Sequence, residues 1–242
     1  RVGSCRDELG RRSGAGRAGP PGGKDGALVM TGQALTVDVY SDVVCPWCYI
    51  GKRRLEQALE SVQVQATARV FWRPFQLNPT MPKAGMDRRV YLEAKFGGPG
   101  EMKAIQDRVA AVGTSVGIEF VFDRIARTPN TFDAHRLIRF AQQQGRQDEV
   151  VEELFHGYFT EGLNIGQPEI LVSLAVRAGL DGEAVGRLLH AQEGVDAVRQ
   201  EEAHGHQLGI RGVPYFVLNG KAALSGAQPV ETFVSAIIQV TG

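Results

Sequence analysis

Residues 40–56 read YSDVVCPWCYIGKRRLE, and this stretch decides how the fold of the whole chain is interpreted. Just before its cysteines, residues 35–40 (LTVDVY) alternate apolar and polar side chains with β-branched content, which indicates a strand. Residues 46–60 then carry apolar side chains at helical spacing, with a proline in the first turn, where a missing N–H is harmless. The pattern therefore predicts that Cys45 lies at the N-terminus of a helix.

A second strand is expected after that helix, at residues 66–72 (ATARVFW). A strand, a helix and a strand in a run of this length predict a right-handed βαβ unit whose two strands are parallel. Residues 74–83 (PFQLNPTMPK) contain three prolines and no periodic pattern, which indicates a structured linker.

The sequence becomes mainly helical from residue 87 to about residue 208. The clearest helix has Asn130 or Thr131 at its N-cap and stops at Gly145. Residues 118–122 form an apolar run that is too short to assign. Helices are expected at residues 87–96, 101–116, 131–144, 147–160, 168–178, 182–190 and 194–208.

Extended structure returns after the helical region. Asn219 and Gly220 lie between two extended runs, residues 215–218 and 221–224, and such a pair is the strongest short-range hairpin signal. Residues 229–240 then form an amphipathic helix. The order of these elements predicts an α/β chain with a thioredoxin-like fold and a large all-helical insertion. The expected parts are a flexible leader (1–33), a thioredoxin-like N-terminal part (34–86), the helical insertion subdomain (87–208) and a thioredoxin-like C-terminal part (209–242).

The composition argues against several classes of partner. The 27 basic and 27 acidic residues cancel, so no overall field attracts nucleic acid or an anionic membrane. Apolar runs all fall short of the roughly 18 residues that a membrane-spanning helix needs. Residues 1–33 are rich in Gly and Arg and lack the apolar segment of an export signal, so we expect a cytoplasmic protein. In that segment Cys5 is expected to be a bystander thiol, and Met30 is a candidate for the natural start.

The spacing of Cys45 and Cys48 places both thiols on the first turn of the helix. The free N–H groups and the dipole at a helix N-terminus stabilise negative charge, so they favour the thiolate of Cys45. We expect Cys45, exposed at the helix start, to attack a substrate sulfur, and Cys48, one turn in and more buried, to resolve the product. Pro46 rigidifies this turn, and Trp47 offers an apolar surface for a substrate peptide or thiol.

Two other interpretations of the cysteine pair are weaker. A structural zinc site needs about four ligands, and Cys5 and the five histidines provide no second pair at zinc-finger spacing. A structural disulfide across so short a loop removes little chain entropy and therefore stabilises weakly. A CxxC pair beside a βαβ pattern in a cytosolic protein indicates thioredoxin-like redox chemistry instead. We expect no metal and no cofactor beyond a redox-active disulfide between Cys45 and Cys48.

Four stretches carry a family resemblance: YSDVVCPWCYIGKRRLE (40–56), PFQLNP (74–79), NTFDAHRLIRFA (130–141) and GIRGVPYFVLNGKAALSGAQP (209–229). Together they resemble the DsbA-like thioredoxin superfamily and, within it, the FrnE-type cytoplasmic dithiol oxidoreductases. The resemblance implies a thioredoxin fold interrupted by an all-helical subdomain. It also implies that Cys45 is the nucleophile and Cys48 the resolving thiol, with exchange through a mixed disulfide.

The pair Val213 and Pro214 comes just before the expected hairpin. Taken alone, a Val-Pro bond is expected to be trans. In thioredoxin-like folds a cis-proline before this strand faces the redox pair, and the backbone of the residue before it binds an extended substrate. The resemblance therefore implies a cis bond between Val213 and Pro214, and a substrate-binding role for both. The same role is expected for Pro46, Trp47 and Asn130, the last at the start of a helix that borders the cleft.

A neighbouring branch resembles the chain almost as well: the kappa-class glutathione transferases and the chromene carboxylate isomerases. That branch uses glutathione and carries Ser in place of the first cysteine, so Cys45 argues against it. The SGAQP turn near residue 225 and the NTFDAHRL helix still leave room for a low-molecular-weight thiol such as glutathione near Cys45. Glutathione-dependent isomerase or transferase activity is therefore the alternative function, and a redox-silent binding module is a third.

The expected partners are thiol or disulfide substrates, from proteins or small molecules. The direction of exchange (oxidase, reductase or isomerase) stays open, and a homodimer is one option for the oligomeric state. Other residues are expected to be structural: His135, in the helix that begins near Asn130; His204 and His206, whose spacing puts them on different helix faces; and Arg53 and Arg54, on a solvated face.

Overall fold

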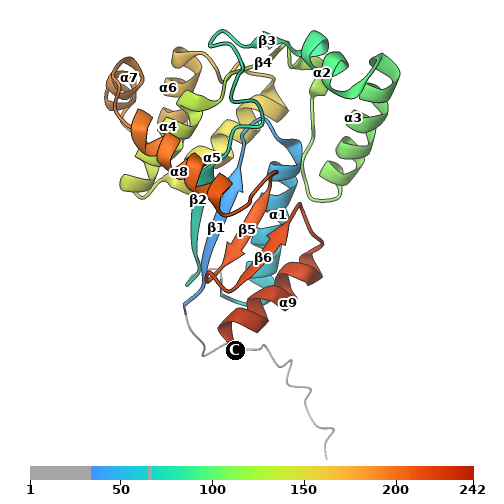
Figure 1. The fold of residues 1–242 in the computed structure, drawn as a ribbon, viewed down its shortest axis with the longest axis vertical. Coiled ribbons are helices and arrows are strands. Elements are labelled where there is room, and N and C mark those ends of the chain that lie inside the picture. Colours follow the sequence, from blue (N-terminus) through green and yellow to red (C-terminus); the bar gives the residue numbers. More distant parts are fainter. Residues whose placement is uncertain (1–33, 65–66) are drawn as a thin grey trace, which may run out of the picture.

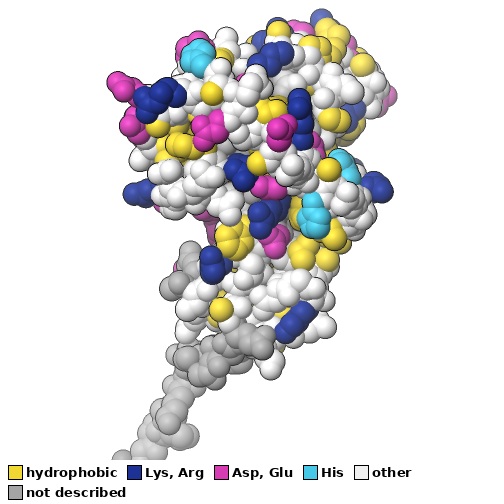
Figure 2. Space-filling model, turned by 60° about the vertical axis from the view of Figure 1, so that its left-hand side comes forward, with side chains coloured by type: hydrophobic (Ala, Val, Ile, Leu, Met, Phe, Trp, Pro, Cys, Tyr) yellow, Lys and Arg dark blue, Asp and Glu magenta, His cyan; other side chains and the backbone are white. Residues whose placement is uncertain are grey.

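The computed structural model describes residues 34–64 and 67–242 of the chain. The expected leader at residues 1–33, with Cys5 and the candidate start Met30, lies outside the described residues. None of the helices in the described part is both long and apolar enough to cross a membrane. Acidic and basic side chains are interspersed over the face seen in Figure 2, in keeping with a formal net charge of zero.

The helices expected from the sequence are all present, and most of their bounds differ from the expected ones by one or two residues. The strands are β1 (Thr36–Ser41), β2 (Arg69–Pro74), β3 (Met86–Asp87), β4 (Arg127–Thr128), β5 (Tyr215–Leu218) and β6 (Ala222–Ser225). The helices are α1 (Pro46–Ser61), α2 (Arg88–Phe96), α3 (Pro99–Thr114), α4 (Phe132–Gln143), α5 (Gln147–His156), α6 (Pro168–Arg177), α7 (Gly182–His190), α8 (Val195–Gln207) and α9 (Val230–Thr241). A 3₁₀ turn (Phe122–Arg124) precedes β4, and a π-helical turn (Gly157–Glu161) follows α5.

A four-stranded sheet in the order β2-β1-β5-β6 forms the thioredoxin-like part of the fold (Figure 1). β1 pairs parallel with β2 and antiparallel with β5, and β5 pairs antiparallel with β6. Successive side chains of a strand point to opposite faces, so the fully buried Val37 and Val39 face one side and Asp38 and Tyr40 the other. The parallel pairing of β1 and β2 around α1 confirms the predicted βαβ unit.

Helices cover both faces of this sheet. On one face α1 and α9 pack against each other (Figure 1), and they bury Ile50, Phe233 and Ile237 in the main core. Burial of each such side chain stabilises the fold by about 1.5–3 kcal/mol. On the other face Gly205 of α8 approaches the ring of Tyr40 so closely that a Cβ there would lie 2.7 Å from Tyr40 Cε1. The absence of a side chain at Gly205 therefore lets α8 contact the sheet.

The hairpin between β5 and β6 confirms the turn predicted from Asn219 and Gly220. Both residues are left-handed, with φ of 50° and 63°, as the favoured two-residue hairpin turn requires. The Asn219 side chain also accepts a hydrogen bond from Thr36 N at 2.7 Å and donates one to Val240 O at 3.3 Å. The turn is thereby hydrogen-bonded to β1 and to α9, which fixes β5 beside β1 in the sheet.

The helices α2–α8 gather at the end of the sheet where β1 leads into α1, with α2 and α3 to one side and α4–α8 to the other (Figure 1). The linker predicted at residues 74–83 runs between these groups and is held by polar contacts. Leu77 N donates to Asp42 Oδ2 at 2.7 Å, and Asn130 Nδ2 donates to Met81 O at 2.7 Å. Asn130 Oδ1 also accepts from the backbone at the start of α4 at 3.0 Å. These bonds hold the linker as one wall of the site described below.

Three details differ from the expectation. β2 begins later, at Arg69, because Ala68 N bonds back to Val64 O at 2.8 Å in a turn. The helix expected at residues 147–160 ends as an α-helix at His156 and continues as the π-helical turn. The pair β3 and β4 was not expected, since strands of two residues are too short to show an alternating pattern.

Candidate active site

Cys45 occupies the N-cap position of α1, just beyond the end of β1. Its backbone is extended (φ −93°, ψ 111°), its N–H donates to Asp42 O at 2.9 Å, and its carbonyl accepts from Cys48 N at 3.0 Å. Pro46 follows in the first turn, where no N–H is needed. The sulfur therefore lies at the positive end of the α1 dipole.

The side chain of Cys45 is more enclosed than expected. The residue is 5% exposed, and its Sγ lies 3.7 Å from Val213 O, to which the thiol donates. The expectation of an exposed thiol at this position is wrong, because the Val213 backbone, the linker, α2 and α3 surround the start of α1. Access to the sulfur is through the cavity that these segments enclose.

Cys48 lies behind Cys45 and is fully buried, with 0% exposure. Both thiols are free. Burial raises the pKa of the Cys48 thiol well above its usual value, and its contact with Cys45 raises the pKa further, while bonds from Ser41 and Asp42 lower it. Cys48 is therefore an uncharged thiol near neutral pH. This state suits a resolving cysteine, which loses its proton only when it attacks the mixed disulfide.

The bond between Val213 and Pro214 is cis, which confirms the cis bond that the resemblance implied. Pro214 packs on α1 at Gly51, where a Cβ would lie 3.1 Å from Pro214 Cγ and 3.0 Å from Phe216 Cζ. The Pro214 carbonyl accepts from Gly226 N at 2.8 Å, within the SGAQP turn. These contacts hold the Val213 carbonyl at the N-terminus of α1.

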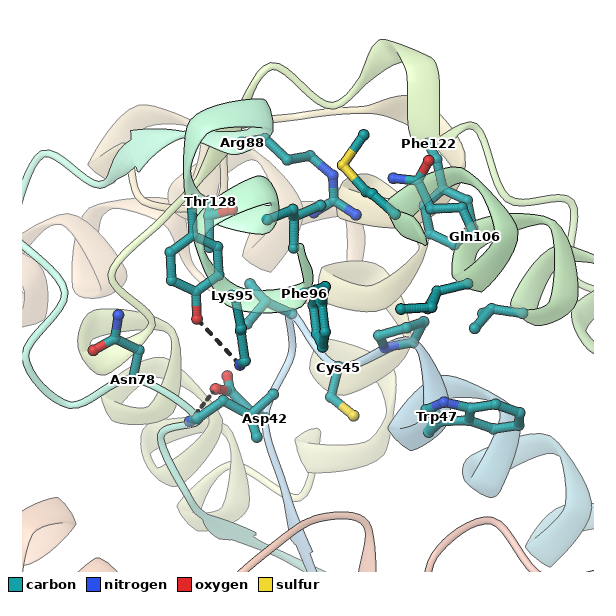
Figure 3. Close-up of a pocket in the computed structure, with 18 of the residues that line it drawn as sticks. Asp42, Cys45, Trp47, Asn78, Arg88, Lys95, Phe96, Gln106, Phe122 and Thr128 are labelled. Carbon is teal, nitrogen blue, oxygen red and sulfur yellow. Dashed lines mark hydrogen bonds between the residues drawn. The ribbon is translucent and has the colours of Figure 1, made fainter. Parts of the chain in front are cut away.

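A cavity of about 370 Å³ opens beside Cys45, between the start of α1, the linker, α2 and α3 (Figure 3). Its walls are mainly apolar and include Val44, Met81, Leu92, Phe96, Val109 and Phe122. Three of the predicted substrate-binding residues line it: Pro46, Trp47 and Val213. Pro214 and Asn130 do not line it, and both ends of the Asn130 amide bond to the protein. A substrate-binding role for Asn130 stays a prediction.

Three charged residues in the cavity wall, Asp42, Arg88 and Lys95, were not singled out from the sequence. Asp42 is 1% exposed, and its Oδ1 lies 3.6 Å from Nε2 of the buried His135, beyond hydrogen-bond length. Asp42 could have been singled out from the sequence, because it is the one charged residue among the residues just before Cys45 (residues 39–44). Nothing in the sequence distinguishes Arg88 from Arg89, since only the fold buries one of them.

A network of charged side chains joins α1 to α5. Lys52, which is 3% exposed, pairs with Glu56, with Asp148 at 3.0 Å and with Glu152 at 3.2 Å. Burial alone would lower the pKa of Lys52, but the three carboxylates raise it above its usual value. Burial likewise opposes ionisation of Glu152, but Arg53 and Lys52 lower its pKa. Lys52 and Glu152 are therefore charged at neutral pH, and the network fixes the helix that carries the cysteines.

The expectation that Arg53 and Arg54 lie on a solvated face holds only in part, because both side chains are half-buried. Arg53 Nη2 donates to Glu152 of α5, and its Nη1 donates to Glu56 Oε2 within α1 at 2.9 Å. Arg54 Nη1 donates to Ala227 O at 2.5 Å. Both side chains therefore connect α1 to other parts of the fold, which the sequence alone could not indicate because their partners are distant in the chain.

The histidines near the end of α8 lie apart from the cysteine pair. The His206 ring packs on Phe75, with 5.2 Å between the ring centres. Within the ranges that the structure describes, no group of three or more His, Cys, Asp or Glu side chains is arranged to hold a metal ion.

Comparisons with known proteins agree with this arrangement. The family model described as "DSBA-like thioredoxin domain" matches residues 36–238. The uncharacterized protein YwbO of Bacillus subtilis is 30% identical over 202 residues, which cover 83% of this chain and 94% of that protein. The crystal structure of a probable DsbA oxidoreductase from Streptomyces coelicolor is 36% identical with a TM-score of 0.79, and the match covers 85% of this chain and 89% of that one.

A more distant structure shares the fold. The cytosolic disulfide reductase DsbM from Pseudomonas aeruginosa, solved with GSH, matches with a TM-score of 0.60 at 18% identity, over 85% of this chain and 98% of that one. The likeness extends over the sheet and the helical insertion together, which agrees with the predicted α/β fold.

Proposed function

This chain belongs to the family of DsbA-like thioredoxin domains and is a thiol–disulfide oxidoreductase, and we propose that Cys45 and Cys48 carry its chemistry. One observation supports the proposal most: Cys45 stands at the N-terminus of α1, 3.7 Å from Val213 O, with the buried Cys48 thiol behind it. Within the family we propose the FrnE-type branch, on the stretches that carry the resemblance.

Exchange would begin when the Cys45 thiolate attacks one sulfur of a substrate disulfide, R–S–S–R′. A mixed disulfide forms between Cys45 and R–S, and R′–S leaves as a thiolate that takes a proton from solvent. Cys48 then loses its proton and attacks the Cys45 sulfur, so that R–S leaves as the second thiolate. The substrate disulfide is thereby reduced and the cysteine pair oxidised. The reverse sequence oxidises a dithiol substrate.

The neighbours of Cys45 suit the binding of a substrate thiol or disulfide. The Val213 carbonyl can accept a hydrogen bond from a substrate N–H, and Pro46 and Trp47 provide an apolar contact surface beside the Cys45 sulfur. These roles are part of the proposal. A cytoplasmic location and a homodimer stay predictions.

Trapping of the intermediate tests the proposal. In the full chain with Cys5→Ser, the Cys48→Ser variant should accumulate mixed disulfides with substrate thiols, because the second attack is lost. The matched Cys45→Ser variant should form none. Mass spectrometry of the non-reduced proteins reports the outcome, and equal trapping by both variants would remove Cys45 from its assigned role.

Glutathione-dependent isomerisation or transfer is the second candidate function. The observation that favours it is the cavity beside Cys45, which is large enough for a small-molecule substrate. In this case Cys48 is dispensable, whereas dithiol exchange requires it. Glutathione binding measured by calorimetry, together with full activity of the Cys48→Ser variant, would favour this function over dithiol exchange.

A further inference from the structure

Arg88, the first residue of α2, brings a positive charge to the cavity beside Cys45 without a carboxylate to balance it. The residue is 9% exposed, and its Nη1 donates to Tyr158 OH at 2.8 Å. Its Nε is buried and has no hydrogen-bond partner. The rings of Phe122 and Tyr158 each lie 5.7 Å from the guanidinium carbon. No carboxylate of the described chain lies within ion-pair distance of Arg88.

A buried guanidinium without a counter-ion is stabilised when an anion binds beside it. Removing a charge from water is unfavourable unless a counter-ion and hydrogen bonds replace the lost hydration. Arginine has five N–H donors in a planar fork that matches the oxygens of a carboxylate. The hydroxyl of Tyr158 and two aromatic rings satisfy only part of the need of Arg88. An acidic ligand in the cavity would supply the rest.

The other features of the cavity restrict what that ligand can be. Arg88 lies across the cavity from Cys45 and Asp42, and the ring of Phe96 lies in the space between them (Figure 3). The buried Asp42 lies at the cysteine end, and the other cation of the cavity wall, Lys95, donates to Tyr91 OH at 3.2 Å. The volume of about 370 Å³ falls in the range of about 300–1,000 Å³ that is typical of small-molecule sites.

We infer that this cavity binds a small, mostly apolar organic acid whose carboxylate pairs with Arg88 and whose sulfur reaches Cys45. The inference rests on the proposed function, because it names the substrate class of the Cys45–Cys48 pair. For a symmetrical disulfide R–S–S–R of this kind, attack by Cys45 forms Cys45–S–S–R and releases one R–S⁻. Attack by Cys48 on the Cys45 sulfur releases the second R–S⁻, and the two thiol protons of the cysteines balance the two thiolates.

A matched pair of probes tests the charge preference. Naphthylacetate and naphthylacetamide share the same apolar ring and differ in the charge of one small group. Calorimetry with the reduced full chain should show that the carboxylate binds at least about tenfold more tightly than the amide, because a charge-assisted bond to arginine is formed. Equal affinities would overturn the inference, and this comparison requires no variant.

Variants then assign the preference to Arg88. Arg88→Met should bring the affinity for naphthylacetate down to that for naphthylacetamide and leave the amide unchanged, whereas Arg88→Lys should retain part of the preference. The control is Arg89→Met, because the neighbouring Arg89 is exposed and pairs with Glu93 at 3.2 Å. A full preference for the carboxylate in a folded Arg88→Met protein would overturn the inference.

Sulfur exchange separates this inference from the proposed function. In a Cys5→Ser background, reduction of the anionic dithiobis(nitrobenzoate) should slow by about tenfold in Arg88→Met, while reduction of the neutral dithiodipyridine stays unchanged. If neither disulfide reacts at Cys45 although naphthylacetate binds, the proposed function fails and the acid site stands. If both react at rates that Arg88→Met does not change, the acid site fails and the redox function stands.

Discussion

Replacement of Gly51 by alanine should destabilise the protein although alanine is the better helix former. In an ordinary helix interior, alanine stabilises by about 1 kcal/mol relative to glycine. At Gly51 the new Cβ would lie 3.0 Å from Phe216 Cζ and 3.1 Å from Pro214 Cγ. Overpacking of this kind costs about 1–3 kcal/mol. The packing cost exceeds the gain in propensity, so the free energy of unfolding should fall by roughly 1 kcal/mol.

Urea denaturation of the reduced protein measures this effect, and Gly186→Ala is the matched control. Gly186 lies in α7, and apart from its chain neighbours and the nearby backbone of its own helix, nothing lies within 4 Å of a Cβ placed there. Gly186→Ala should therefore raise the free energy of unfolding by up to about 1 kcal/mol. Because Pro214 must move in Gly51→Ala, that variant alone should also slow disulfide exchange. If Gly51→Ala gains stability as Gly186→Ala does, the close packing of α1 on Pro214 is refuted.

Two further predictions concern buried ionisable groups. Lys52→Met should lower the free energy of unfolding by about 2 kcal/mol. This loss is smaller than that expected for a fully buried ion pair, because the partner carboxylates are partly exposed. The control Lys103→Met, in an exposed pair with Asp107, should leave the free energy of unfolding unchanged. Denaturation curves that shift equally for both variants would contradict the role of the Lys52 network. Because folding raises the pKa of Cys48, the stability that this thiol contributes is complete below an ordinary thiol pKa of about 8.5 and is lost as the pH rises through the folded-state value. Reduced wild-type protein should therefore lose more stability than Cys48→Ser between about pH 8 and pH 10, and parallel curves would contradict this.

The outline of the fold could be predicted because its signals are local. The strand before Cys45, the helix after it and the turn at Asn219 and Gly220 each depend on a few neighbouring residues, and each is present as expected. The cis bond before Pro214 is a different case. Its own sequence favours trans, and only the resemblance of the whole chain indicated the opposite.

The features that could not be predicted depend on contacts between segments that are far apart in the chain. Cys45 is enclosed by Val213, which is 168 residues away, so local pattern indicated exposure where the fold gives burial. Arg54 bonds to a carbonyl 173 residues away, and its place on the helix gave no sign of this partner. The burial of Arg88 likewise follows from the way α2 closes over the cavity. Sequence periodicity does not report on contacts of this kind.

Selective alkylation tests most directly whether Cys45 is the reacting sulfur. The reduced full chain is treated with iodoacetamide at about pH 6, where an ordinary thiol is almost fully protonated and slow. Peptide mass spectrometry then follows each of the three cysteines separately. We predict that Cys45 is labelled well before Cys5 and that Cys48 stays unlabelled until the protein unfolds. Labelling of Cys48 as early as Cys45, or equally slow labelling of all three, would contradict the account.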